Sequence, residues 1–394
     1  MCQQRNPVGN KTAYTIAGYG EMIMDGPRMD AYFRALQQLV RPGCTVIDIG
    51  CGTGIFSLLA CQLGAGQVHA IEPGDAIEVA RTIAADNDCM DRIAFYHKLS
   101  MDVILEKKAD VIISDLRGIL PLFQFHIPSV IDARKRLLVS DGTMIPRKDM
   151  LWAALVEAPD LYKSCREPWL RNNFNLDMHA GRPFVINSFR KANLKPEQVL
   201  VQPGCWGTLD YESIEDPNMR GSLSWEVEKT VTAHGFAAWF DTILGDGIGF
   251  SNAPGQPELI YGQAFFPWAE PVKLMRGDSV SLHIQADLIG DDYSWKWDTR
   301  IVNGQDPQKV RAEFKQSTFY GQPLSLANLR KKASNFVPDL ADKGKMDLFI
   351  LNLMDGGRTL EEIAVKVKDS FPDRFKDWRE ALTRVGELSQ KYSR

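Results

Sequence analysis

The 394-residue sequence has no long apolar run and no excess of positive charge. No stretch approaches the roughly 18 uninterrupted apolar residues of a membrane helix, so we expect no membrane span. The amino-terminal segment MCQQRNPVGNKTAY lacks the apolar core of a signal peptide, and a cytoplasmic location is therefore expected. Because the formal net charge is -4, the sequence does not predict a nucleic-acid surface.

Cysteine and histidine are present but are not arranged as metal ligands. The seven cysteines include no CxxC pair, and the six histidines do not cluster with them. The residues therefore predict no metal site, and the thiols are interpreted as reduced packing residues of a reducing compartment. A hydrophobic content of 44% is sufficient for a large core, and the length predicts two or three domains.

The chain from about residue 43 to 145 alternates short apolar runs with amphipathic stretches. The apolar runs predict strands over 45–49, 68–72, 93–96 and 110–114, and the amphipathic stretches predict helices over 56–63 and 76–87. Strands and helices in alternation predict a parallel sheet with helices on both faces. We therefore expect an α/β fold that begins with a Rossmann-like domain over residues 1–147.

The pattern changes after Pro146. Between residues 150 and 320, short β-rich runs and many turn residues predict an antiparallel β-barrel or sandwich domain over 148–328. Trp295 and Trp297 alternate on one predicted strand and are interpreted as barrel core. A third, small unit is expected over 335–394, with helices over 346–354, from the capping-box pair Thr359 and Glu362 through 367, and over about 377–391.

A glycine-rich turn links the first predicted strand to a helix, and it reads Asp48-Ile49-Gly50-Cys51-Gly52-Thr53-Gly54. Glycine lets the backbone approach a ligand closely and adopt torsions that other residues avoid. Glu72 ends the next strand, about 20 residues after the turn, where an acid suits the two hydroxyls of a ribose. The GxGxG spacing differs from the GxGxxG that seats a pyrophosphate, which favours S-adenosylmethionine over a dinucleotide.

Residues from about 14 to 320 resemble the protein arginine methyltransferases. The matching segments are Glu21 to Tyr32, the glycine turn with Glu72, residues 112–118 and 130–142, and barrel segments at 237–241 and 249–251. The resemblance implies that Met22 packs on S-adenosylmethionine and that Arg28 pairs with its carboxylate, which needs a charged donor when it is partly buried. The family's adenine-contacting glutamate falls near Ser100, so a backbone contact or Asp102 must serve. The cofactor-binding residues implied in this way are Met22, Arg28, Asp48, Gly50, Gly52, Gly54, Glu72, Ser100 and Met101.

The sequence departs from the family in the acceptor half of the site. The family holds the substrate guanidinium between two glutamates, and here these positions are Asp115 and Gln124, with Arg117 between them. A guanidinium stays charged and prefers carboxylate partners, so one carboxylate and one amide balance it poorly. We expect Asp115 to orient the acceptor or take its proton, with Gln124 and His126 as hydrogen-bond partners. His126 is a general base if its pKa is near neutral, and otherwise a structural histidine.

The family's threonine-histidine-tryptophan loop is also replaced, by Leu259-Ile260-Tyr261. The sequence thus predicts methyl transfer to a small molecule or peptide, in specialised natural-product metabolism, and not to protein arginine. Two alternatives stay open: an arginine N-methyltransferase with a degenerate acidic pair, and a cofactor-binding scaffold without activity.

Two further expectations concern assembly and the C-terminal unit. The segment over 174–200 resembles the family's dimerisation arm and implies a two-fold homodimer. Residues 348–392 resemble the small winged-helix PqqD-like domains, which bind leader peptides by adding a strand to a sheet edge. The alternative is a helical appendage that packs on the barrel or the dimer.

Overall fold

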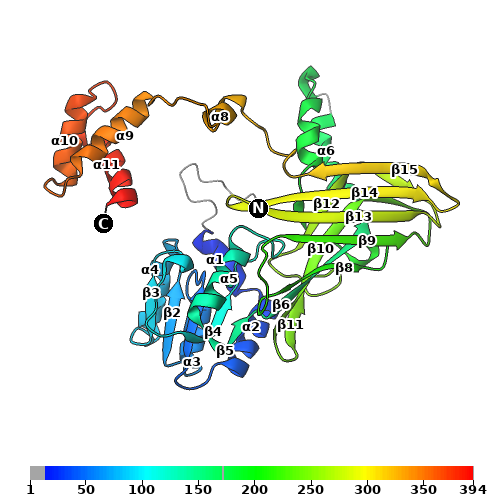
Figure 1. Cartoon of the computed structure of the whole chain (residues 1–394), viewed down its shortest axis with the longest axis horizontal. Helices are drawn as coiled ribbons and strands as arrows, with labels where there is room; N and C mark the ends of the chain where they lie inside the picture. Colours follow the sequence, from blue (N-terminus) through cyan, green and yellow to red (C-terminus); the bar gives the residue numbers. More distant parts are fainter. Residues whose placement is uncertain (1–13, 171–172, 394) are drawn as a thin grey trace. The chain divides into compact units, whose positions relative to one another are not determined.

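The computed structural model describes residues 14–170 and 173–393, and the chain forms two compact units (Figure 1). One unit ends at Pro323 and the other begins at Leu324. The larger unit contains a parallel sheet followed by antiparallel sheets, as the sequence predicts, so the first two predicted domains form a single body. In the part of the chain described, no helix is long and apolar enough to cross a membrane.

The parallel sheet has the strand order β3-β2-β1-β4-β5. Its strands are β1 (Thr45–Ile49), β2 (Gln67–Ile71), β3 (Ile93–Tyr96), β4 (Ala109–Ser114) and β5 (Leu138–Ile145). The helices of this domain are α1 (Ile16–Ile23), α2 (Gly26–Leu39), α3 (Ile55–Gln62), α4 (Ala76–Asp86) and α5 (His126–Leu137), with the short η1 (Ser100–Asp102). The four strands and two helices predicted here are confirmed to within one residue at each end.

Both faces of the parallel sheet are buried. Val46, Val68 and Val111 belong to one apolar cluster, whereas Ile47 and Ile112 belong to another. Neighbouring residues of a strand point to opposite faces, so two separate clusters are what helices on both sides of a sheet produce. From β1 the chain builds the sheet outwards in one direction, through β2 to β3, and then returns to the other side of β1 to form β4 and β5. The strand order therefore reverses between β1 and β4, which are hydrogen-bonded neighbours.

The antiparallel region consists of two sheets. One has the order β7-β12-β10-β6-β8, with β11 paired to β10, and the other has the order β15-β14-β13-β9. Trp295 and Trp297 are 2% and 0% exposed, which confirms that they are core residues. The strands are β6 (Lys148–Val156), β7 (Arg190–Ala192), β8 (Gly204–Asp210), β9 (Met219–Glu226), β10 (Val231–Gly245), β11 (Ile248–Ser251), β12 (Gln263–Leu274), β13 (Ser279–Ile289), β14 (Asp292–Asn303) and β15 (Asp306–Ser317).

A helical arm interrupts the antiparallel region between β6 and β7 (Figure 1). It comprises α6 (Pro159–Leu170), η2 (Asn173–Asn175), η3 (His179–Gly181) and α7 (Arg182–Ile186). The sequence-based limits of 174–200 were misplaced, because α6 lies before them and β7 already pairs with β12. The loop after β7 contains only η4 (Pro196–Gln198).

The second unit is helical. It contains α8 (Leu326–Lys331), α9 (Asp342–Leu353), α10 (Leu360–Ser370) and α11 (Trp378–Tyr392), and Ile350, Val367 and Val385 are fully buried in its core. The predicted capping box is present, since Thr359 Oγ1 accepts from Glu362 N and a Glu362 carboxylate oxygen accepts from Thr359 N. Among residues 324–393 there is no strand. The winged-helix form expected from the resemblance is therefore wrong for this unit, and strand addition has no sheet edge there.

Candidate functional site

The glycine turn lies at the carboxyl end of β1, next to the point where the strand order changes direction. Gly50, Gly52 and Gly54 have φ values of 73°, 53° and 85°, a region that favours glycine. A Cβ on Gly52 would lie 2.3 Å from Cε1 of Tyr19, so only glycine fits beneath helix α1. Ligands of open α/β sheets bind in the crevice at this position. The turn therefore lies where ligands of this sheet class bind, with the Tyr19 ring of α1 packed against Gly52.

Two buried carboxylates fix the shape of the turn. Asp48 accepts hydrogen bonds from Ser57 N (3.0 Å) and Ser57 Oγ (2.7 Å), which anchors the start of α3 to the end of β1. Burial raises the pKa of Asp48 to about 7. Glu72 accepts from Gly52 N at 3.1 Å and from Gly74 N at 2.7 Å. Burial also raises the pKa of Glu72, although the two backbone donors oppose the shift.

Helix α2 delivers Arg28 to the centre of the site. Asp25 caps the helix by accepting from Arg28 N, and its other oxygen accepts from Ile260 N at 2.7 Å. The guanidinium of Arg28 is buried, and its Nη1 donates to the carbonyl of Met22 at 3.0 Å. Met22 is half-buried on α1. The two residues that the resemblance assigns to the cofactor are thus in direct contact.

Asp115, on the loop after β4, accepts hydrogen bonds on both oxygens. Its Oδ2 receives Arg28 Nε (2.8 Å), Arg28 Nη2 (2.6 Å) and the hydroxyl of Tyr261 (2.6 Å). Its Oδ1 receives Arg117 Nε at 3.0 Å. Burial alone would raise the pKa of Asp115, but Arg28 and Arg117 outweigh it and hold the pKa well below its usual range. Asp115 is therefore expected to be ionised at neutral pH.

Arg117 connects the parallel sheet to the antiparallel domain. Its side chain is fully buried, and its Nη1 contacts Asp149 on β6 (3.0 Å) and Thr242 on β10 (2.9 Å). The Arg117 Cζ atom lies 5.3–5.8 Å from the centroids of four aromatic rings, a range typical of cation–π contacts. These rings belong to Tyr32, Phe240, Phe250 and Tyr261. Arg117 thus holds the loop of Asp115 against the barrel.

His126 differs from the expectation of a near-neutral general base. It begins α5, is 1% exposed, and its Nδ1 lies 2.8 Å from the carbonyl oxygen of Pro121. Burial lowers the pKa of His126 to about 4. The near-neutral pKa that a general base needs, which the sequence left open for His126, is therefore not found. Gln124 is half-buried and has a left-handed backbone with φ of 44°, immediately before the cap of α5.

The loop expected to contact adenine, at Ser100 and Met101, is held by hydrogen bonds from a residue that the sequence analysis did not identify. Ser100 is buried and Met101 is 42% exposed in η1. Arg136 of α5 donates to the carbonyls of Ser100 (2.8 Å), Met101 (3.3 Å) and Val103. Tyr261 and Asp149 were also missed as site residues, because each joins the site from a distant part of the chain. Tyr32 lies in the recognised segment of α2, but its contact with Arg117 was not predicted. The sequence signal for Arg136 was its position as a basic residue in the last turn of α5, where it can donate to nearby backbone carbonyls.

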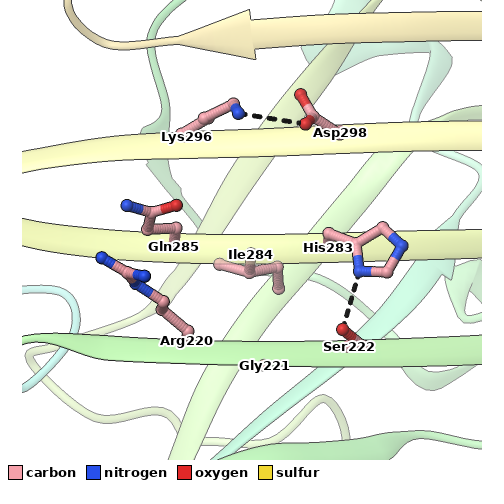
Figure 2. Close-up of a pocket in the computed structure, with 8 residues that line it drawn as sticks. All are labelled: Arg220, Gly221, Ser222, His283, Ile284, Gln285, Lys296 and Asp298. Atoms are coloured by element: carbon pink, nitrogen blue, oxygen red, sulfur yellow. Dashed lines mark hydrogen bonds and ion pairs between the residues drawn. The ribbon is translucent and has the colours of Figure 1, made fainter.

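A separate hollow lies on the exposed face of the four-stranded sheet (Figure 2). It is lined by polar side chains of β9, β13 and β14, and Ile284 of β13 also borders it. His283 Nδ1 lies 2.7 Å from Ser222 Oγ, and Lys296 pairs with Asp298 at 3.3 Å. These groups are mutually paired and largely solvated, which is the ordinary state of a polar sheet face. None of the predicted site residues lies in this hollow.

Comparison with known protein families gives two matches that divide the chain. Residues 30–164 match the family described as ribosomal protein L11 methyltransferase (PrmA). Residues 147–305 match the arginine methyltransferase oligomerization subdomain. The two matches overlap over residues 147–164, which contain β6 and the start of α6.

Curated relatives and solved structures agree with this division. Protein arginine N-methyltransferase 2 of Mus musculus is 31% identical over 277 residues, which are 66% of this chain and 62% of that protein. The probable protein arginine N-methyltransferase 6 of Arabidopsis thaliana is 31% identical over 56% of this chain and 53% of that protein. The chain thus spans about half to three fifths of the length of these relatives.

Among solved structures, protein arginine methyltransferase 10 of Arabidopsis thaliana aligns with a TM-score of 0.68 at 23% identity, covering 77% of this chain and 97% of that one. The Trypanosoma brucei PRMT1 enzyme-prozyme heterotetrameric complex with AdoHcy aligns with a TM-score of 0.68 at 19% identity, covering 76% and 96%. The fold is therefore like that of these protein arginine methyltransferase structures: a Rossmann-like parallel sheet followed by an antiparallel β domain. In sequence the chain is similar to members of this family.

Proposed function

We propose that the protein is an S-adenosylmethionine-dependent methyltransferase, and the observation that carries this proposal is the glycine turn with Glu72 beneath it. The three glycines of the turn, with φ between 53° and 85° and no side chains, suit the close approach of a nucleoside. Glu72 would bind the ribose hydroxyls, Ser100 and Met101 the adenine, and Met22 the body of the cofactor. Asp48 acts through its contact with Ser57, which keeps the turn in place.

Arg28 is the proposed partner of the cofactor carboxylate. It is buried and already bound to Asp115, so a cofactor carboxylate would share or take over this guanidinium. When bound, the cofactor supplies an activated methyl group on a sulfonium, and the protein's task is to hold an acceptor in line with it. Because Arg28 contacts both Asp115 and Met22, cofactor binding is coupled to the position of the acceptor carboxylate.

We further propose that the acceptor is a small molecule or peptide group without a guanidinium, in specialised natural-product metabolism. The buried ion-pair network contains two arginines, Arg28 and Arg117, and two aspartates, Asp115 and Asp149, so its formal charges cancel. With the cofactor carboxylate on Arg28, a guanidinium entering this site would meet one carboxylate, Asp115, that still accepts from Arg117, and burial of a poorly balanced cation is costly. An uncharged or anionic acceptor carries no such penalty.

The proposed role of Asp115 is to orient the acceptor. Its strongly lowered pKa keeps it an acceptor of hydrogen bonds, and it can align an N–H or O–H of the acceptor towards the cofactor. Gln124 is proposed as a second hydrogen-bond partner. His126 is proposed to stabilise the start of α5, since its ring is buried beside Tyr211 at 5.3 Å between centroids.

The arm supports the proposal of a two-fold homodimer. Phe174 and Leu176 are 95% and 58% exposed, and large apolar side chains exposed together are typical of an interface.

Two statements remain predictions of the sequence. One is the cytoplasmic location, and the other is the division into domains over residues 1–147, 148–328 and 335–394.

Release of S-adenosylhomocysteine tests the proposed activity. The purified protein is incubated with S-adenosylmethionine and cell extract, or with metabolites of neighbouring pathways, and product is measured by mass spectrometry. We expect acceptor-dependent release, which the Arg28→Ala variant loses. A protein that binds the cofactor but releases no product with any acceptor fraction would be the inactive scaffold instead.

A further inference from the structure

Tyr261 lies between the two charged groups on which the proposed reaction depends. It is part of the loop that connects β11 to β12, and its side chain is buried. Its hydroxyl donates to Asp115 Oδ2 at 2.6 Å and accepts from Arg28 Nε at 3.1 Å. The hydroxyl therefore bridges the guanidinium proposed for the cofactor and the carboxylate proposed for the acceptor.

The position of this hydroxyl is fixed by the packing of its ring and by the backbone of its loop. The ring stacks on that of Phe250, with 5.9 Å between centroids, and meets the ring of Phe240 edge-on at 5.2 Å. One residue earlier, Ile260 N donates at 2.7 Å to Asp25, which caps α2. Because these contacts do not involve the guanidinium of Arg28, the hydroxyl can keep its place when that guanidinium changes partner.

The hydroxyl also keeps its proton. Burial, followed by the charge of Asp115, raises the pKa of Tyr261 well above its usual range, against the smaller opposing effects of Arg117 and Arg28. A protonated phenol donates one hydrogen bond and can accept others. Tyr261 therefore donates to Asp115 and accepts from Arg28 at the same time.

The donors on Asp115 show what would change when the cofactor binds. Its Oδ2 receives two nitrogens of Arg28 together with the Tyr261 hydroxyl, whereas its Oδ1 receives Arg117 Nε. If the cofactor carboxylate draws the guanidinium of Arg28 away, Tyr261 stays on Oδ2 and Arg117 stays on Oδ1. A buried carboxylate oxygen that loses its donors is costly, so the hydroxyl lowers the free energy needed to release Arg28.

We propose that Tyr261 is a positioning residue, which keeps Asp115 in place while the cofactor carboxylate takes over Arg28. This inference rests on the proposed function and adds the group that allows the exchange of partners. The acceptor N–H or O–H then meets a carboxylate whose orientation the tyrosine has already set. Tyr261 acts through Asp115 and Arg28 and not by contact with the reacting atoms.

Two ligands separate this role from a structural one. S-Adenosylhomocysteine has the carboxylate that competes for Arg28, whereas methylthioadenosine has the same nucleoside and no carboxylate. In calorimetric titrations of the full chain, Tyr261→Phe should weaken the binding of S-adenosylhomocysteine about tenfold and that of methylthioadenosine less than about twofold, because the lost hydrogen bond matters only when Arg28 is released. A loss for methylthioadenosine as large as that for S-adenosylhomocysteine would make Tyr261 a structural residue and overturn the proposal. Unchanged affinity for S-adenosylhomocysteine would overturn it as well.

A double-mutant cycle with Asp115→Asn gives a second measurement. Without the carboxylate nothing competes for Arg28, so in the Asp115→Asn background Tyr261→Phe should change the affinity for S-adenosylhomocysteine less than about twofold. Tyr293→Phe removes another hydroxyl of a buried tyrosine, which donates to the Pro217 carbonyl, and as the matched control should leave this affinity unchanged.

The cycle also distinguishes failure of this inference from failure of the proposed function. Additive effects of Tyr261→Phe and Asp115→Asn would contradict the positioning role while leaving the cofactor site intact. If the unmodified protein did not bind S-adenosylhomocysteine, the proposed function would be refuted, and this inference with it.

Discussion

Arg28 is the residue on which the cofactor and acceptor halves of the site converge. Its Nε and Nη2 both lie within 2.8 Å of one oxygen of Asp115, and its Nη1 is held by the Met22 carbonyl. In the proposed function, the cofactor carboxylate and Asp115 would therefore compete for the same cation. Binding of the cofactor should loosen Asp115 from Arg28, so that Asp115 becomes available to an acceptor only after the cofactor has bound.

Removal of Arg28 or Glu72 should weaken the cofactor site. We expect Arg28→Ala and Glu72→Ala each to lower the affinity for S-adenosylmethionine by about 1–3 kcal/mol, because a charge-assisted hydrogen bond is lost. Calorimetric titration measures this directly. Arg34→Ala and Glu78→Ala, at exposed positions of α2 and α4, are the matched controls. Unchanged affinity in both site variants would refute the assignment.

Substitution of Asp115 should separate catalysis from cofactor binding. Asp115→Asn removes the charge that competes for Arg28, so the affinity for S-adenosylmethionine should be retained or increased. Methyl transfer should fall at least about 100-fold if the carboxylate orients the acceptor. The two quantities are measured by calorimetry and by S-adenosylhomocysteine release. Parallel loss of both would indicate that Asp115 only stabilises the fold, and full activity would remove it from the reaction.

The residues of this network could be predicted only in part. Arg28, Asp115 and Arg117 lie in motifs that the sequence displays, and the proximity of Arg117 to Asp115 follows from their two-residue separation. The hydroxyl of Tyr261 reaches Arg28 across 233 residues of sequence, and Asp149 pairs with Arg117 from another domain. No local pattern encodes such contacts, since they depend on how the barrel packs on the sheet. The lowered pKa of His126 likewise follows from burial that the sequence does not reveal.

At the scale of elements, the segment from β1 to α3 was predictable and carries a testable pH dependence. The apolar run, the glycines and the following helix each have a local signal. Asp48 is buried between strand and helix, and burial raises its pKa to about 7. The folded state then binds the proton more tightly than the unfolded state, where a carboxyl has a pKa of about 3.9. Stability from this group is present below pH of about 4 and is lost as the pH rises towards about 7.

Asp48→Asn should remove this pH dependence, because the amide oxygen still accepts from Ser57 and carries no charge. The unfolding free energy of the variant relative to the unmodified protein should rise by about 1–3 kcal/mol between pH 5 and pH 7.5. Urea unfolding at both pH values provides the measurement. Asp86→Asn, at an exposed position of α4, is the matched control. A difference between Asp48→Asn and the unmodified protein that does not change with pH would contradict the account.

Elements that depend on long-range packing were predicted less well. The arm was located but its limits were wrong, because the polar and apolar residues of α6 do not distinguish a projecting helix from a packed one. The C-terminal helices were predicted closely, since the capping box at Thr359 and the apolar periodicity are local signals. The strand implied there by resemblance has no counterpart in the structure.

At the scale of the molecule, the exposed apolar tip of the arm predicts a homodimer. Light scattering at micromolar concentration should give twice the chain mass. The double variant Phe174→Ser with Leu176→Ser should shift the protein towards the monomer, because it removes apolar surface from the proposed interface. Ile289→Ser, which changes a 65% exposed apolar residue of β13, should leave the mass unchanged. A monomer mass for the unmodified protein would dispose of this prediction.

Radiolabelled methyl transfer tests the central claim, that this is a methyltransferase whose acceptor is not a guanidinium. The protein is incubated with labelled S-adenosylmethionine and either an arginine-rich peptide or fractionated cell extract, with a bona fide arginine methyltransferase assayed alongside. We predict negligible label in the peptide and incorporation into an uncharged or anionic component of the extract, because the one acceptor carboxylate, Asp115, is already paired with Arg117. Turnover of the peptide comparable to that of the arginine methyltransferase would contradict the charge argument and make the protein an arginine methyltransferase.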